Sequence, residues 1–153
     1  MNTSLALDRS LTTETGLSEA TAATESGLNI VVVFTTPHAT ISALRSASGL
    51  AVSLGATIKL VVLQVVPYPL PLTSPPVLLD FQEKRFCELA HASPVDIRVQ
   101  LYLCRDQLET LKIALKPHSI VVIGGRKRWW PTREQRLARK LQNHHEVIFA
   151  ETV

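Results

Sequence analysis

The sequence predicts an α/β protein in which a five-stranded parallel sheet lies between two layers of helices. The first observation behind this prediction is order: five segments of strand character alternate with four segments of helical periodicity. The second is that three of the strand segments are unbroken apolar runs, which are typical of parallel strands covered on both faces. Because parallel neighbours need right-handed crossovers, the helices are expected on both sides, in a three-layer αβα sandwich.

The strand segments also predict their order in the sheet. The continuous runs Ile30–Phe34, Ile58–Val66 and Ile120–Ile123 belong in the centre. Val95–Leu103 alternates apolar with polar residues, which indicates a peripheral strand, and Val147–Ala150 forms a short last strand. A strand order of 3-2-1-4-5, numbered along the chain, satisfies these demands. It gives a Rossmann-like sheet whose winding reverses between the first and fourth strands.

Each predicted helix has a recognisable start or stop signal. Thr36 can cap the first helix, with Pro37 at its first position, and Gly55 ends it. Capping-box residues open the third and fourth helices, and prolines close the second and third. The helices are expected between Thr36 and Gly55, from Val77 to about Ala92, between Asp106 and Pro117, and from Thr132 through Leu141.

Length and composition bound the class of protein. A chain of 153 residues has room for one domain, which we predict over residues 28–153, after a disordered N-terminal tail at 1–27 that is rich in Thr, Ser, Ala and Glu. The 46% of hydrophobic residues excludes global disorder. No apolar run approaches the ~20 residues of a membrane-spanning helix, and the N-terminus lacks the apolar segment of a secretory signal. We therefore expect a cytoplasmic protein.

Residues that could carry catalysis or hold a metal form no recognisable motif. Cys87 and Cys104 lack metal-ligand spacing and are interpreted as small buried hydrophobic residues. His144 and His145 follow a predicted helix, where imidazoles commonly stabilise the negative helix end. No nucleophile elbow, Walker loop or zinc-protease motif is present. We expect a non-enzymatic protein with no metal and no resident cofactor.

The element order, together with two segments, resembles the universal stress protein family. The segments are Leu28–Ala56 and Ser119–Ala150, and the resemblance covers residues 28–153. It implies an adenine nucleotide alpha hydrolase-like fold. It also implies a homodimer formed through the last strand, which in this family commonly pairs with its mate. The residues of that dimer edge would be Val147, Ile148, Phe149 and Ala150.

Nucleotide-binding members of that family carry an aspartate after the first strand and a Gly-x2-Gly-x9-Gly-Ser/Thr motif after the fourth. Thr35 stands at the aspartate position, and Gly124 matches the first glycine. Lys127, Leu137 and Ala138 replace the other two glycines and the hydroxyl residue. Side chains at these places would obstruct a backbone phosphate cradle, so the resemblance implies that ATP is not bound in the family's standard mode.

The predicted strand order places a crevice at the carboxyl ends of the first and fourth strands. A functional interpretation makes it a pocket for a nucleotide or small anion, bound by helix N–H groups and basic side chains. A structural interpretation leaves Thr36 as a helix cap and the glycines as a sharp exit from the strand. The candidate ligand-binding residues are Thr35, Thr36, His38, Gly124, Gly125, Arg126 and Lys127.

A basic segment carries most of the positive charge. The chain has a formal charge of +3, whereas residues 126–140 hold seven bases against one acid, a local charge of +6. The basic patch consists of Arg126, Lys127, Arg128, Arg133, Arg136, Arg139 and Lys140. With Trp129 and Trp130 beside it, the patch could dock a protein partner, nucleic acid or an anionic membrane surface. Alternatively it is a solvated face on which one indole packs against the sheet edge or the last helix.

These observations lead to one primary prediction of function and two alternatives. The primary prediction is a non-enzymatic regulatory or stress-response protein of the universal stress type. The first alternative is a nucleotide or small-anion sensor that uses the crevice. The second is a nucleic-acid or anionic-surface binder that uses the Arg126 to Lys140 face.

Overall fold

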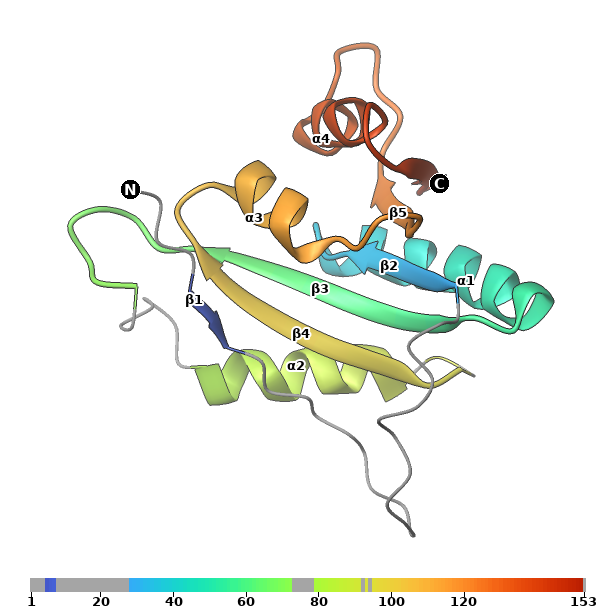
Figure 1. The fold of residues 1–153 in the computed structure, drawn as a ribbon, viewed down its shortest axis with the longest axis horizontal. Helices are drawn as coiled ribbons and strands as arrows, with labels where there is room; N and C mark the ends of the chain where they lie inside the picture. The colour runs from blue at the N-terminus through green and yellow to red at the C-terminus, as the bar shows by residue number, and fades with distance from the viewer. Residues whose placement is uncertain (1–4, 8–27, 73–78, 92, 94, 153) are drawn as a thin grey trace, which may run out of the picture.

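The computed structural model describes residues 5–7, 28–72, 79–91, 93 and 95–152. Its strands form one six-stranded sheet with the order β1-β4-β3-β2-β5-β6, seen across the centre of Figure 1. The elements are β1 (Leu5–Leu7), β2 (Asn29–Val33), α1 (Pro37–Leu54), β3 (Thr57–Val65), α2 (Leu79–His91), β4 (Ile97–Cys104), α3 (Gln107–Ala114), β5 (Ile120–Gly125), α4 (Arg133–Leu141) and β6 (Glu146–Glu151).

Five of these strands confirm the predicted sheet. β2 pairs in parallel with both β3 and β5, β4 continues the sheet beyond β3, and β6 continues it beyond β5. In the numbering of the prediction this is the order 3-2-1-4-5. All six residues of β5 are buried, as expected for a central strand with apolar residues on both faces.

Two hydrophobic cores confirm the three-layer sandwich. Ile30 and Val32 of β2 face a core that includes apolar residues of α1 and α2. Val31 and Val33 face the opposite core, which includes apolar residues of α3 and α4. Because successive strand residues point to opposite faces, an unbroken apolar strand supplies both cores at once.

The sheet has one strand that the sequence analysis did not expect. β1 lies within the predicted N-terminal tail and pairs antiparallel with β4, with Leu5 opposite Leu103. β1 has only three residues, which are too few to show the two-residue period of a strand. The hydrophobic pattern of the sequence therefore did not predict it. The other residues of the predicted tail lie outside the described residues.

Side-chain caps fix the beginnings of α1, α3 and α4 as predicted. The Thr36 hydroxyl accepts from the first turn of α1, and Gly55 ends that helix with a φ of 60°. Asp106 accepts two backbone N–H groups at the start of α3. At the start of α4, Thr132 and Gln135 form a reciprocal capping box with bonds of 3.1 and 3.3 Å.

A close contact joins α1 to the centre of the sheet. A Cβ atom on Gly124 would overlap with the carbonyl oxygen of Ala39 and lie 3.2 Å from the Cβ of Ala43. Only glycine therefore allows the first turns of α1 to lie on the backbone of β5.

We predict that Gly124→Ala lowers the free energy of unfolding by about 3 kcal/mol, because the added methyl group meets backbone rather than a movable side chain. Gly49→Ala is the matched control. Gly49 lies inside α1 with open space around it, so alanine there should raise stability by about 0.5–1 kcal/mol. Urea denaturation of both variants measures the two changes, and equal effects would contradict the close contact.

Candidate anion-binding site

Two helices begin beside the same pocket at the carboxyl end of the sheet. The pocket has a volume of about 350 Å³, and both N-cap residues, Thr36 of α1 and Thr132 of α4, line it. α1 follows β2 and α4 follows β5, and these two strands are neighbours. The pocket therefore lies at the point where the winding of the sheet reverses, which is where open α/β sheets place ligands.

The charges around this pocket favour an anion. The N-terminal end of a helix carries a partial positive charge, and two such ends border the cavity. Arg126 and Arg128 add two guanidinium groups, and Glu134 is the one carboxylate in the described lining. The Thr36 and Thr132 hydroxyls each accept a backbone N–H, which leaves each hydroxyl hydrogen able to donate.

Thr35 and Gly124 are hydrogen-bonded to each other, and each precedes a residue that lines the pocket. The Thr35 hydroxyl donates to the Gly124 carbonyl over 2.9 Å, and its backbone N–H donates to the Thr40 hydroxyl over 3.3 Å. The first bond joins the residues that follow β2 to the end of β5. Neither residue is part of the described lining.

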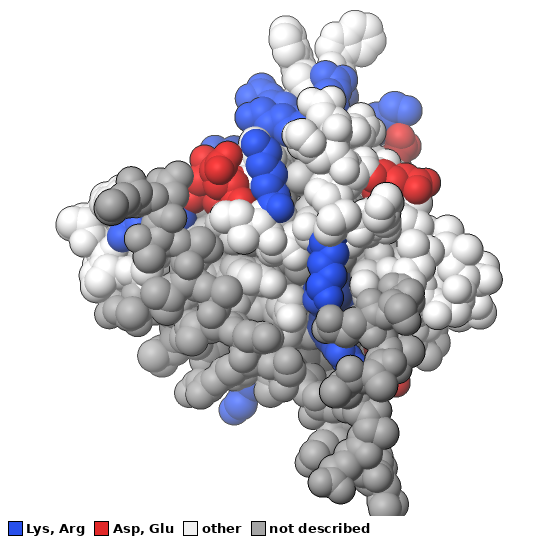
Figure 2. Space-filling view, in the orientation of Figure 1, with Lys and Arg blue, Asp and Glu red and all other residues white. Residues whose placement is uncertain are grey.

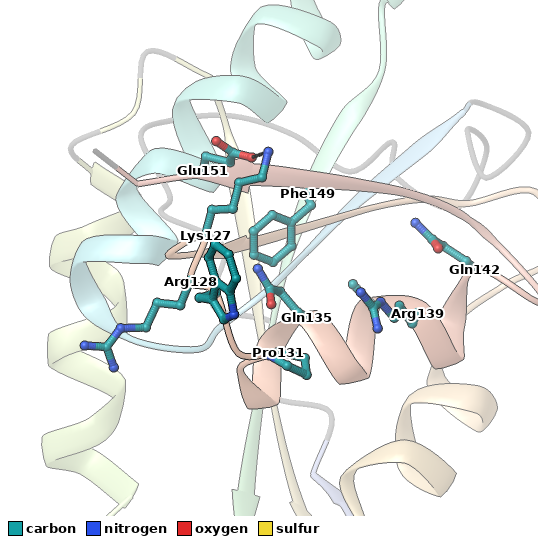
Figure 3. Close-up of a pocket in the computed structure, with 10 residues that line it drawn as sticks. Lys127, Arg128, Pro131, Gln135, Arg139, Gln142, Phe149 and Glu151 are labelled. Carbon is teal, nitrogen blue, oxygen red and sulfur yellow. Dashed lines mark ion pairs between the residues drawn. The ribbon is translucent and has the colours of Figure 1, made fainter.

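Lys127 lies in a neighbouring pocket of about 370 Å³ between α4 and β6. Its ammonium group is 3.1 Å from a carboxylate oxygen of Glu151, and both side chains are exposed. Figure 3 shows this ion pair, with Phe149 of β6 and Gln135 of α4 lying toward each other nearby. Gly125 lines the first pocket, and a Cβ there would lie 2.7 Å from the ring of Phe149, which lines the second.

The structure thus brings four of the seven predicted ligand-binding residues to one pocket: Thr36, His38, Gly125 and Arg126. Sequence reasoning did not assign Thr132, Glu134 and Thr152 to it. Thr132 had been identified as a helix cap, and the strand order places that cap at the same sheet edge as Thr36. Nothing in the local sequence indicated Thr152, which follows the last strand.

The basic patch is exposed throughout, and so are both tryptophans. Trp129 is 97% exposed and Trp130 is 79% exposed. The interpretation in which an indole packs on the sheet edge or on α4 is therefore wrong. Residues 128–132 line a hollow beside both indoles. Trp129 also borders the pocket between α4 and β6.

The buried Cys104 thiol offers little reactivity. Burial raises the pKa of the Cys104 thiol; a hydrogen bond with Thr110 lowers it, and the charge of Asp106 raises it. A raised thiol pKa disfavours the nucleophilic thiolate. Within the described residues, no three His, Cys, Asp or Glu side chains gather as metal ligands.

We predict that Thr35→Asp lowers the free energy of unfolding by about 2 kcal/mol at neutral pH. An ionised carboxylate cannot donate to the Gly124 carbonyl and would repel it. The loss should shrink as the pH falls, because a protonated carboxyl can donate again and the folded state raises its pKa. Thr35→Ser keeps the hydroxyl and is the control. A loss that is the same for both variants, or that does not depend on pH, would contradict this role.

No family model and no curated protein matches the sequence. Among solved structures, the chain is similar to a protein of the universal stress protein family from Burkholderia pseudomallei. The TM-score is 0.58 and the sequence identity 19%, and the match covers 81% of this chain and 96% of that chain. No helix among the described segments is both long and apolar enough to cross a membrane. The order of the strands, the helices on both faces and this likeness agree: the chain has the α/β fold of the universal stress proteins.

Proposed function

We propose that this chain is a cytoplasmic, non-enzymatic regulatory protein of the universal stress type that responds to a small phosphate-bearing anion. The observation that carries the proposal is the pocket at the carboxyl ends of β2 and β5. Two helix N-termini, two arginines and two capping hydroxyls border it. Backbone N–H groups at helix starts and guanidinium groups are the usual partners of phosphate oxygens.

The proposed ligand is not ATP held in the standard way of that family. The resemblance places the motif's third glycine and hydroxyl at Leu137 and Ala138. Both residues lie inside α4, and Ala138 is 4% exposed and packs in the core. Lys127, at the second glycine, is paired with Glu151. These residues do not fit a glycine-lined phosphate cradle.

A non-enzymatic role agrees with the polar groups of the pocket. The lining offers hydroxyls, the His38 imidazole and the Glu134 carboxylate. No hydrogen bond among the described side chains joins one of these hydroxyls to either candidate base. An activated nucleophile needs such a pairing, so the arrangement favours binding over reaction.

We predict that ATP, AMP, a cyclic dinucleotide or inorganic phosphate raises the melting temperature. A ligand at 100 times its dissociation constant should add about 2.7 kcal/mol to the free energy of unfolding. Arg126→Glu combined with Arg128→Glu should abolish the shift. Arg98→Glu is the control for charge, because Arg98 is exposed on β4 and distant from the pocket in the sheet order. The proposal fails if none of these compounds shifts the melting temperature, or if the double variant responds like the wild type.

The dimer implied by the family resemblance would use the free side of β6. Among the described strands β6 pairs with β5 alone. The Thr152 N–H donates to Gly125, so the alternate residues Val147, Phe149 and Glu151 direct their backbone groups away from β5. Edge groups of this kind are available to a second copy of the strand.

We predict that Val147→Pro converts a dimer into a monomer. Proline removes an N–H on the outer edge while the ladder to β5 is kept, and edge strands tolerate such a proline. Analytical ultracentrifugation measures the mass, and circular dichroism checks the fold. The matched variant Val147→Thr keeps the N–H and should remain dimeric. A wild-type chain that sediments as a monomer, or a proline variant that sediments as a dimer, would contradict pairing through β6.

A further inference from the structure

The loop between β5 and α4 presents two indoles to solvent. The chain has two tryptophans, and both stand in this loop, residues 126–132, which we call the tryptophan loop. With exposures of 97% and 79%, Trp129 and Trp130 gain almost no packing in the isolated chain. In Figure 1 the loop rises beyond α4, and Figure 2 shows uncharged side chains projecting at that end of the molecule. Large exposed apolar side chains at one protruding place mark a surface that another body covers.

Positive charge surrounds this projection. Arg126, Lys127 and Arg128 precede the indoles and are exposed. α4 continues the surface: Ala138 and Leu141 are buried, whereas its basic residues are exposed. Those residues are Arg133, Arg136, Arg139 and Lys140. Figure 2 shows Lys and Arg side chains close to the projecting group. The basic patch and the two indoles therefore form one continuous surface.

We propose that the tryptophan loop and the exposed face of α4 dock this protein on an anionic lipid bilayer. Indoles partition into the headgroup region, where the ring is in an apolar environment and its N–H can still donate. Lys and Arg side chains are attracted by the negative surface potential of anionic lipids. The two attractions act from adjacent residues, so both operate when the loop meets a flat membrane.

The shape of the loop favours a bilayer over nucleic acid. Proteins that hold single strands combine a basic groove with aromatic side chains on which bases stack. Here Trp130 lines only the hollow formed by Arg128 to Thr132. Trp129 also borders the pocket between α4 and β6, but it is 97% exposed, so neither indole is enclosed in a stacking slot. A protruding tip needs no wall to enter a headgroup layer.

The loop shares Arg126, Arg128 and Thr132 with the anion pocket, but the inference can be tested without changing that pocket. Trp129 and Trp130 do not line that pocket in its described part, and neither do Arg136 and Lys140. Substitutions at these four positions therefore test the membrane surface while Arg126 and Arg128 remain in place. A chain that binds vesicles without responding to phosphate compounds, or the reverse, would separate the two proposals.

The experiment uses the full chain with vesicles of phosphatidylcholine, with and without one third phosphatidylserine. Because both tryptophans lie in the loop, intrinsic fluorescence reports on the loop directly. We expect a blue shift with the anionic vesicles, none with the neutral ones, and a weaker response at high salt. In co-sedimentation, Trp129→Ala with Trp130→Ala should weaken binding by about tenfold or more. Arg136→Glu with Lys140→Glu should do the same.

Arg45→Glu with Arg98→Glu is the matched control, since it makes the same change in charge at exposed positions outside the patch. It should bind like the wild type. Melting temperatures of the tryptophan variants should be unchanged, because the indoles are exposed. Equal loss in the control pair, equal binding to neutral vesicles, or fluorescence quenching by a single-stranded oligonucleotide with no response to vesicles would each overturn the proposal.

Discussion

The contact between the first turns of α1 and the backbone of β5 fixes the geometry on which the site depends. Gly124 leaves no room for a side chain beneath the Ala39 carbonyl, so α1 starts in direct contact with the strand. The Thr35 hydroxyl then binds the Gly124 carbonyl at the same point. The end of β2, the start of α1 and the end of β5 are therefore held together by one glycine and one hydroxyl. Thr36, the next residue, is placed at the pocket as a consequence.

Gly125, the next residue of β5, allows a similarly close approach on the opposite face of the sheet. Because successive residues of a strand point to opposite sides, a side chain on Gly124 would meet α1, whereas one on Gly125 would meet Phe149 and the first turn of α4. Two adjacent glycines thus let helices on both faces approach the end of one strand. The N-termini of α1 and α4 converge for this reason, and no phosphate-wrapping glycine loop is needed to account for the pair.

Most of the fold could be predicted from the sequence, because it is encoded in local signals. Unbroken apolar runs gave the central strands, and caps such as Thr36 and Thr132 gave the helix starts. What the sequence did not show depends on long-range geometry. β1 is too short for a period, and Lys127 turns toward Glu151 only because β6 lies alongside β5. The position of the pocket in the fold could be predicted from the sequence, but the complete set of residues that line it could not.

The charge of the pocket depends in part on Thr35, the second residue after β2. The Thr35 hydroxyl donates to the Gly124 carbonyl, and this neutral residue adds no negative charge next to Thr36 of the pocket. Glu134, the one carboxylate in the described lining, stands in the first turn of α4, where the helix dipole stabilises it. Its charge offsets the positive end of its own helix. The N-terminus of α1, together with Arg126 and Arg128, is left as the part of the pocket with uncompensated positive potential. The anion that we propose as the ligand would therefore lie on the side of α1, over the strand end that the Gly124 contact holds in place.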